Sequence, residues 1–410
     1  MPESFSFQVT HTDGQARRGV LTTPHGVVHT PAFMPVGTRG AVKAVTHRDL
    51  EDAGAEIILG NTYHLLLRPG AALIARAGGL HRFIGWARPI LTDSGGYQVF
   101  SLAAMRKVTE DGVTFRSPLD GALHTLTPEG AADIQAQLGS DIAMVLDELV
   151  GPAPETVTVT LSGPVPDPES VTVTVPDPVT LATARAAMER SIRWARRART
   201  RQLQLREGPH AAPDVRITNP GQAQFGIIQG GTDAALRTES VQATVAIGFE
   251  GYAIGGLSVG EPVDVMYDVV AHTAPQLPAD QPRYLMGTGM PDDLVECVAR
   301  GIDMFDCVLP TRSGRTGQAF TAHGPLNMRN ARFAEDQEPI EPNCPCPACT
   351  TFSRAYVHHL VKSGEILGAM LMTQHNLWFY QRMMQGLRDA IAAQALKSFA
   401  SGFLTRYRGS

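Results

Sequence analysis

The 410-residue chain lacks the features of an exported, membrane-spanning or generally RNA-binding protein. Its start has no apolar core of signal-peptide length, and the sequence has no stretch of about 18 apolar residues, so we expect neither export nor membrane insertion. Lys and Arg total 35 against 40 Asp and Glu, a net charge of -5, so the basic excess of a general nucleic-acid binder is missing. The sequence therefore predicts a cytoplasmic protein in which any RNA contact uses a local basic patch.

Cysteine is also scarce, because the chain has only five. The number is odd, and Cys344, Cys346 and Cys349 lie within six residues. This argues against a disulfide framework and for a metal site in a reducing compartment. We interpret Cys297 and Cys307 as ordinary buried residues.

Eight short apolar runs that end in Gly or a polar residue recur along the chain, separated by helix-length amphipathic segments. This alternation is typical of a parallel sheet built from βα units, and eight units favour a closed (β/α)8 barrel. The runs cover residues 30–38, 55–62, 88–96, 141–148, 224–231, 251–260, 282–289 and 304–310. We therefore predict an α/β fold with a barrel over 1–330, and a smaller part over 331–410 with the cysteine cluster and C-terminal helices.

Polar residues close several of these runs, namely Asn61, Asp93, Asp147, Gln229 and Asp306. Barrel enzymes build their sites at the carboxyl ends of the strands. A single Asp there often only caps the next helix, but several acids and amides on one face favour a site. Two carboxylates from different strands suit displacement at a sugar anomeric carbon, where one attacks and the other handles a proton. The pattern alone predicts a barrel enzyme of glycosyl transfer.

The residues that follow the first and last of these acids fit such a site. Gly95 and Gly96 allow close backbone approach of a ligand, and Tyr97 is placed to cover a flat ring. Arg312 and Arg315 lie where they could hold phosphates.

Two stretches interrupt the barrel pattern. The insertion at about 151–180 repeats Val/Thr alternation over residues 155–160 and 169–174, which we interpret as a hairpin in preference to a mobile Pro-rich loop. The Arg-rich segment that follows predicts a helix, either a solvated outer helix of the barrel or, less favoured, a phosphate-binding one.

The cysteine cluster has the spacing C-x-C-x2-C, and His375 lies 26 residues after its last member. Three thiolates and one imidazole would close a tetrahedral zinc shell with no open position, which is the structural kind of zinc site. On spacing alone, His358 and His359 compete with His375 as the fourth ligand.

Several segments resemble the bacterial tRNA-guanine transglycosylases, also called queuine tRNA-ribosyltransferases. In order, these are DSGGYQVFSL, FGIIQGG, GYAIGGLSVGE, YLMGTGMPDD, MFDCVLPTRSGR, the cysteine cluster and GEILGAMLMTQHN. Apart from the insertion, the resemblance covers essentially the whole chain. It implies a (β/α)8 barrel with a zinc subdomain near the eighth strand, and a homodimer. It also implies exchange of guanine at the first anticodon position of tRNA for a 7-deazaguanine.

The resemblance assigns roles to individual residues. It implies that Asp306 is the nucleophile, which forms a covalent ribosyl ester with the RNA, and that Asp93 is the general acid and base. The implied substrate-binding residues are Ser94, Gly95, Gly96, Tyr97, Asp147, Gln229, Gly256, Leu257 and Met286. The implied RNA-binding residues are Gly287, Thr288, Gly289, Met290, Pro291, Asp292, Asp293, Thr311, Arg312, Ser313, Gly314 and Arg315. His375 falls where the family places its fourth ligand to one structural zinc.

Two pocket positions bear on the incoming base. Val259 agrees with the bacterial type, which favours 7-aminomethyl-7-deazaguanine, whereas eukaryotic members have a smaller residue there. Leu149 departs from the cysteine that bacterial members usually have after the Asp-Glu pair, so we expect an altered pocket wall.

Two other functions compete with this interpretation. A barrel glycoside hydrolase predicts sugar-stacking aromatics, but aromatic content is only 6%, and the cysteine cluster stays unexplained. A non-catalytic tRNA-binding subunit need not keep Asp93 and Asp306. For the homodimer, Phe352, Tyr356 and His359 fall at helical spacing and offer one interface stripe, unless that stripe packs on the barrel.

Overall fold

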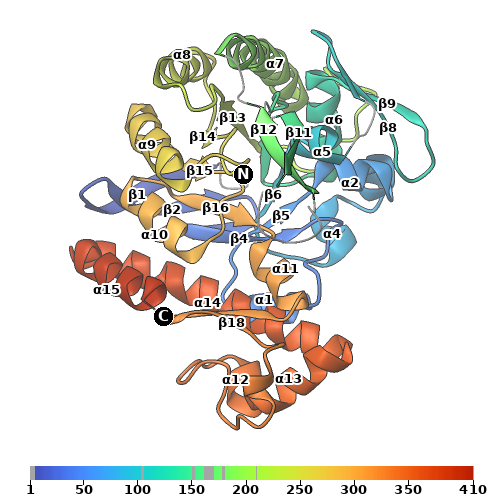
Figure 1. The fold of residues 1–410 in the computed structure, drawn as a ribbon. Helices are drawn as coiled ribbons and strands as arrows, with labels where there is room; N and C mark the ends of the chain where they lie inside the picture. Colours follow the sequence, from blue (N-terminus) through green and yellow to red (C-terminus); the bar gives the residue numbers. More distant parts are fainter. Residues whose placement is uncertain are drawn as a thin grey trace.

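The computed structural model describes residues 5–102, 106–149, 153–160, 170–177, 181–208 and 210–409. Eight parallel strands form a closed barrel in the order β10-β13-β14-β15-β16-β4-β5-β6 (Figure 1). They are β4 (Ala32–Gly37), β5 (Ile58–Gly60), β6 (Ile90–Thr92), β10 (Ile142–Met144), β13 (Ala223–Ile228), β14 (Gly251–Ile254), β15 (Arg283–Leu285) and β16 (Met304–Cys307). Seven of the strands lie within the predicted runs and β13 begins one residue before its run, so the predicted (β/α)8 fold is confirmed.

The barrel strands are buried on both faces. Every residue of β4 and β13 is buried, as expected for parallel strands covered by helices outside and side chains inside. The largest hydrophobic cluster includes Phe33, Phe225 and Phe305 from three of these strands. Because apolar side chains fill the interior, polar side chains can reach a ligand only where the strands end.

Helices surround the barrel and extend beyond it (Figure 1). The helices up to the Arg-rich segment are α1 (His47–Asp52), α2 (Thr62–Leu67), α3 (Ala71–Arg76), α4 (Leu80–Ile84), α5 (Gly96–Leu102), α6 (Pro128–Leu138) and α7 (Leu181–Glu207). The later ones are α8 (Ala234–Val245), α9 (Val263–Thr273), α10 (Pro291–Ala299), α11 (Leu309–Arg315), α12 (Pro347–Thr351), α13 (Arg354–Ser363), α14 (Ile366–Ala392) and α15 (Leu396–Arg408), with 3-10 turns η1 (Ala274–Gln276) and η2 (Ala331–Phe333).

Small antiparallel sheets decorate the barrel, and most of them were not predicted. They are β1 (Ser6–Asp13) with β2 (Ala16–Thr23) and β3 (Gly26–Thr30); β7 (Arg106–Val108) with β8 (Val113–Arg116) and β9 (Leu123–Leu126); and β17 (Gln318–Thr321) with β18 (Gly324–Asn327). The predicted hairpin in the insertion is confirmed, since β11 (Ala153–Thr160) pairs antiparallel with β12 (Ser170–Asp177). The connecting residues 161–169 lie outside the described part.

The Arg-rich helix α7 is tied to its neighbours by ion pairs. These pairs are Arg185–Glu239, Arg190–Glu148, Arg193–Glu110, Arg197–Glu129, Arg199–Glu250, Arg201–Asp133 and Arg206–Glu250. Arginines whose charge already faces a carboxylate are poorly placed to bind phosphates. The pairing therefore supports the outer-helix interpretation.

The C-terminal part packs against the barrel through one long helix. α14 runs unbroken from Ile366 to Ala392. α14 contacts β4 on one side and α12 and α13 on the other (Figure 1). Within the described ranges, no helix combines the length and hydropathy that a membrane crossing requires. The division at residues 330 and 331 stays a prediction.

Candidate active site and metal site

A cavity of about 310 Å³ opens at the carboxyl ends of the barrel strands, a volume at the lower end for small-molecule pockets. Asp93, Asp147 and Asp306 all line it. Its other lining residues include Asn61, Ser94, Gly95, Tyr97, Leu149, Gly256, Leu257, Ser258, Val259, Tyr284, Met286 and Gly287. Most of the residues predicted to bind the base therefore meet around one space.

Asp93 follows β6, and polar groups from the end of β5 hold it. Its Oδ2 accepts a hydrogen bond from the Asn61 side-chain amide at 2.6 Å, and its Oδ1 accepts one from the Thr62 backbone N–H at 2.8 Å. Burial raises the pKa of Asp93 to about 7, and the charge of Asp306 adds to the rise while the hydrogen bonds oppose it. A carboxyl group with this pKa can both give and take a proton near neutral pH.

Asp306 lies on β16, directly beside β4 and β15. Its Oδ1 accepts hydrogen bonds from the Tyr284 hydroxyl at 2.5 Å and from the Gly287 backbone N–H at 3.0 Å. Burial raises the pKa of Asp306, and both hydrogen bonds oppose that rise by stabilising the carboxylate. Both of these hydrogen-bond donors to the Asp306 carboxylate are neutral, so neither of them neutralises its negative charge.

Asp306 does not cap the helix that follows its strand. The helix after β16 has Val308 at its N-cap position and no side-chain cap, so Asp306 plays no such part there. The helix after β5 is capped by Asn61, whose Oδ1 accepts from the His64 N–H at 3.0 Å. Asn61 thus both caps this helix through Oδ1 and donates a hydrogen bond to Asp93 through Nδ2. Capping therefore does not account for Asp306.

Asp147 lines the cavity and forms a hydrogen-bonded pair with Gln229. Gln229 Nε2 donates to Asp147 Oδ2 at 2.6 Å, and burial raises the pKa of Asp147 to about 6. Gly256 approaches this pair so closely that a Cβ there would lie 2.4 Å from Gln229 Oε1, and its φ of +69° also favours glycine. The pair thus presents a fixed set of polar atoms beside a backbone segment.

Of the remaining predicted base-binding residues, Ser94, Tyr97 and Met286 line the cavity, and Gly96 is not among its lining residues. Tyr97 is 56% exposed and Met286 is partly buried, and both line the space. Ser94 Oγ contacts Asp147 Oδ1 at 3.5 Å. A Cβ on Gly96 would lie 3.0 Å from the Asp147 carbonyl oxygen, so the backbone passes close to that acid.

The loop after β14 is held in a fixed shape. Glu261 accepts hydrogen bonds from the backbone N–H groups of Ser258 and Val259, the second at 3.0 Å. Leu149 and Val259, the two positions expected to bear on the incoming base, both line the cavity. Leu149 therefore forms part of the pocket wall, as its departure from the bacterial cysteine suggested.

Several residues of this site were not predicted from the sequence. Tyr284, Thr62 and Glu261 gave no signal, because their importance lies in contacts between strands and loops far apart in the chain. Cys307, interpreted as an ordinary buried residue, lines the cavity, but burial raises the pKa of its thiol to about 11, which keeps it protonated.

The two predicted RNA-binding segments differ in exposure along their length. The exposed members are Gly287, Met290, Arg312 and Arg315. Buried side chains include those of Thr288, Pro291, Thr311 and Ser313. Asp292 pairs with Arg408 at 3.1 Å, and Asp293 accepts from the Tyr267 hydroxyl at 2.6 Å. Only part of each segment can meet a ligand directly.

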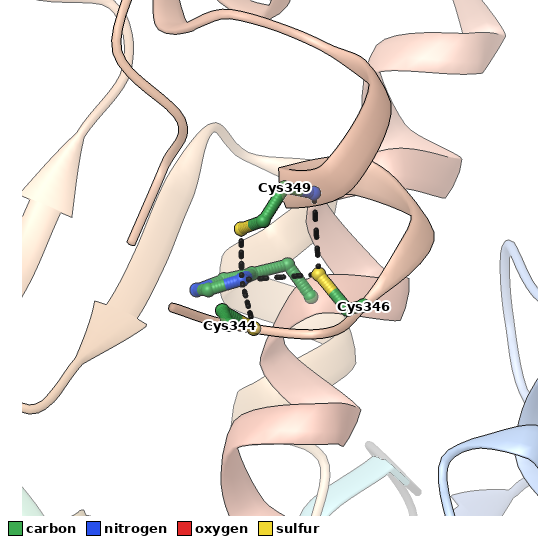
Figure 2. A group of neighbouring side chains, drawn as sticks. Cys344, Cys346 and Cys349 are labelled. Atoms are coloured by element: carbon green, nitrogen blue, oxygen red, sulfur yellow. Dashed lines mark hydrogen bonds between the residues drawn. The ribbon is translucent and has the colours of Figure 1, made fainter. Parts of the chain in front are cut away.

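The cysteine cluster and His375 form a second, separate site. The three sulfur atoms turn toward a common centre in Figure 2. His375 Nδ1 lies 3.8, 3.6 and 3.3 Å from the sulfurs of Cys344, Cys346 and Cys349. All four side chains are buried and could hold a metal ion. His358 instead contacts the Met328 carbonyl at 2.7 Å, so the fourth position belongs to His375.

These distances fit a tetrahedral metal shell. With metal–sulfur and metal–nitrogen bonds of about 2.3 and 2.0 Å, the edges between sulfur and nitrogen would be about 3.5 Å. The other imidazole nitrogen, Nε2, contacts the Phe320 carbonyl at 2.9 Å, which fixes the ring and leaves Nδ1 facing the sulfurs. The site has no further ligand position, as expected for a structural metal.

Comparison with known proteins points to one family. The family model described as queuine tRNA-ribosyltransferase matches residues 12–161 and 170–409, so the break falls inside the insertion. The chain is 54% identical over 408 residues to a queuine tRNA-ribosyltransferase of Sphingopyxis alaskensis, covering 100% of both. It is 55% identical over 403 residues to that of Novosphingobium aromaticivorans, covering 98% of both, and 51% identical over 403 residues to that of Zymomonas mobilis, covering 98% of the chain and 95% of the relative.

Proposed function

The chain belongs to the queuine tRNA-ribosyltransferase family, and from this premise we propose that it replaces guanine at the first anticodon position of tRNA with 7-aminomethyl-7-deazaguanine. As a member of the family it is a tRNA-guanine transglycosylase, an enzyme of queuosine biosynthesis. One observation carries the proposal. Asp93 and Asp306 reach a single cavity from two strands, and the contacts that hold them are neutral donors.

The proposed reaction is a double displacement at the ribose anomeric carbon. Tyr284 and Gly287 hold Oδ1 of Asp306, which leaves Oδ2 to attack C1′. A bond forms between Oδ2 and C1′, the bond from C1′ to guanine breaks, and Asp93 gives its proton to the departing base. The incoming base then gives a proton to Asp93 and attacks C1′, which releases Asp306. The phosphodiester chain stays whole throughout.

Asp147 and Gln229 read the polar edge of the base in this proposal. Their mutual hydrogen bond fixes the free oxygen and amide positions, so a guanine-type edge meets directional partners. Gly256 and Leu257 line the other side through their backbone, and Tyr97 and Met286 sandwich the ring. Stacking of this kind contributes about 1 to 3 kcal/mol per base. Ser94, Gly95 and Gly96 complete the pocket.

The rim of the cavity holds the RNA. Gly287 and Met290 in one segment and Arg312 and Arg315 in the other are exposed, and both segments adjoin the strand of Asp306. Two arginines on a small rim suit the backbone of an anticodon loop, and they agree with an acidic protein that binds RNA locally. The tRNA substrate is also what supports the predicted cytoplasmic location.

The test is base exchange with labelled guanine. Wild-type protein should insert label into a tRNA that carries guanine at the first anticodon position, and Asp306→Asn should abolish this. Asp120→Asn, in an exposed turn of the β8–β9 hairpin, is the matched control and should exchange normally. A protein–RNA adduct that survives denaturation should form with wild-type protein and not with Asp306→Asn.

Each rival has a distinct outcome. Loss of guanine without entry of label indicates hydrolysis, and tRNA binding without either reaction indicates a non-catalytic subunit. Label entry that persists in Asp306→Asn would remove this residue as the nucleophile.

Zinc is the metal that the Cys344, Cys346, Cys349 and His375 group suits best, because thiolates and one imidazole with tetrahedral spacing are a typical structural zinc set. Its role is to hold the segment after β18 in shape. Purified protein should contain about one zinc per chain, and His375→Ala should lose it together with thermal stability. A fully stable protein that contains no metal would overturn this assignment.

The homodimer uses the stripe of Phe352, Tyr356 and His359. Tyr356 is 39% exposed and stacks on Phe352 at 5.3 Å between ring centroids, and His359 is exposed, so this stripe does not pack on the barrel. Native mass measurement of Tyr356→Ala tests this use. A dimer of unchanged strength would remove the stripe from consideration.

A further inference from the structure

Two loops of the active site are joined by a pair of hydroxyl groups. Ser258 lies in the loop after β14, and Thr288 lies in the loop after β15. Their oxygen atoms are 2.9 Å apart. Both hydroxyls also approach the Met266 sulfur on α9, at 3.5 and 3.8 Å, so the pair is satisfied whichever of the two donates. The contact thus closes a small, fully paired polar bridge between the loops.

The Thr288 side chain faces inward. It is only 2% exposed, although its segment was predicted to bind RNA. Its hydroxyl is therefore unable to meet a phosphate, and its partner is Ser258, whose residue lines the base cavity. The role of Thr288 is accordingly to connect the segment to the pocket wall.

Ser258 is held from two directions in an unusual conformation. Its φ is +58°, a left-handed value that non-glycine residues rarely adopt. Glu261 binds its backbone N–H, and Thr288 binds its side chain. Such a conformation persists where the surroundings over-determine it, and residues of this kind cluster at ligand sites. The bridge therefore contributes to the exact shape of the wall beside Leu257 and Val259.

The other end of the bridge reaches the nucleophile. The residue before Thr288, Gly287, donates its N–H to Asp306 Oδ1. The residue after it, Gly289, packs so tightly on the strand of Asp306 that a Cβ there would lie 2.4 Å from the Cys307 Cβ. Thr288 is thus fixed between two contacts with that strand.

We propose that the Ser258–Thr288 hydrogen bond is a positioning contact, which sets the base-reading wall at a fixed distance from the carboxylate that attacks the ribose. This rests on the proposed function. A base held by the wall and a sugar attacked by Asp306 must be aligned at once, and small misplacement lowers the rate of such reactions. Ser258 and Thr288 touch no reacting atom, so they act through Leu257, Val259 and Gly287.

A kinetic double-mutant cycle tests the bridge. Ser258→Ala and Thr288→Val should each lower kcat/KM for the incoming base about 5-fold, the size expected for loss of one neutral hydrogen bond. The double variant should lose no more than either single variant, because the two changes remove the same contact. Thr288→Ser keeps the hydroxyl and should restore exchange. The Kd for tRNA should change less than twofold in all variants.

The controls separate positioning from folding and from the proposed function. Thr114→Val breaks a similar hydroxyl pair, with Thr125 at 3.2 Å, outside the residues that line the cavity, and should leave kcat/KM unchanged. Unchanged kcat/KM in the Ser258 and Thr288 variants, or losses that multiply in the double variant, would overturn the bridge while exchange itself stands. A lower Tm with normal kcat/KM in these variants would show that the Ser258–Thr288 contact stabilises the fold and does not position the reacting groups. Wild-type protein without exchange would refute the proposed function and the bridge with it.

Discussion

Buried or partly buried carboxylates occur at both ends of the barrel strands, and their partners differ. At the amino ends, Asp141 contacts His25 at 2.7 Å and His81 at 3.0 Å, Glu250 pairs with Arg199 and Arg206, and Asp303 pairs with Arg17. Each of these acids directly precedes a strand. At the carboxyl ends, amides, a hydroxyl and backbone N–H groups hold Asp93, Asp147 and Asp306.

The pKa values follow this difference for two of the acids. Burial alone would raise the pKa of Glu250, but hydrogen bonds from Arg199 and Arg206 outweigh it and lower the pKa to about 2. Burial raises the pKa of Asp93 to about 7, since only neutral groups oppose it. In Asp303 the effect of burial exceeds that of the neighbouring cation, because burial raises the pKa of Asp303 despite Arg17. Acids at the amino end thus tie strands together, whereas those at the carboxyl end keep an uncompensated charge that chemistry can use.

The largest effect should come from removing the proton carrier at the carboxyl end. Asp93→Asn should lower the rate of guanine exchange about 1,000-fold, within the range for loss of a general acid and base. The variant should fold normally, because Asn can accept the Thr62 hydrogen bond. Single-turnover exchange with labelled guanine measures the loss. A rate within tenfold of the wild type would deny Asp93 this role.

At the amino end, the same kind of substitution should act on stability instead. Asp303→Asn leaves the buried Arg17 guanidinium without its carboxylate, and breaking a buried pair in this way costs about 3 to 5 kcal/mol. Urea unfolding measures the cost, and exchange per folded molecule should stay at the wild-type level. Arg185→Ala, which breaks an exposed pair with Glu239, is the control and should unfold almost as the wild type does. Loss of exchange in folded Asp303→Asn would contradict the assignment of stability to the amino-end acids and of chemistry to the carboxyl-end acids.

Stability should respond to pH in opposite ways at the two ends. The folded state raises the pKa of Asp93 from 3.8 to about 7, so ionising this group opposes folding as pH rises between those values. Asp93→Asn should therefore gain about 2 kcal/mol relative to the wild type on going from pH 5.5 to pH 8.

Glu250 provides the matched case. Its pKa falls from 4.5 to about 2 on folding, so its stabilising effect is complete above the ordinary value and is lost only as pH drops toward 2. Glu250→Gln should accordingly be destabilised by the same amount at pH 5.5 and pH 8. Unfolding free energies at the two pH values check both variants. If the stability difference from the wild type changed with pH equally in Asp93→Asn and Glu250→Gln, the charge of Asp93 would be compensated in the folded protein.

The sequence revealed the acids at the carboxyl end but not what distinguishes them. Apolar runs that end in Asp93 or Asp306 predict both the strands and the strand-end position of these acids. Both features depend only on neighbouring residues in the sequence. Partners such as Tyr284 and Thr62 are set by which strands become neighbours when the barrel closes, and no local pattern records that. The sheet of β1 to β3 was not predicted either. On spacing alone His358 and His359 competed with His375, and only the family resemblance singled out His375 as the fourth ligand.

The smallest effect worth measuring removes one neutral donor at the carboxyl end. Tyr284→Phe deletes the hydroxyl that binds Asp306 Oδ1 and keeps the buried ring. Exchange should fall about 10-fold, because a hydrogen bond to a charged group contributes more than a neutral one. The pH at which the rate falls on the acidic side should also rise, since that hydroxyl holds the pKa of Asp306 down. His25→Gln removes one of several donors to Asp141 at the other end, and should lower Tm slightly while the rate and its pH profile stay unchanged. If Tyr284→Phe alters only Tm, the Tyr284 hydroxyl contributes to stability alone, as His25 does. The difference between the two ends of the barrel would then not extend to single hydrogen bonds.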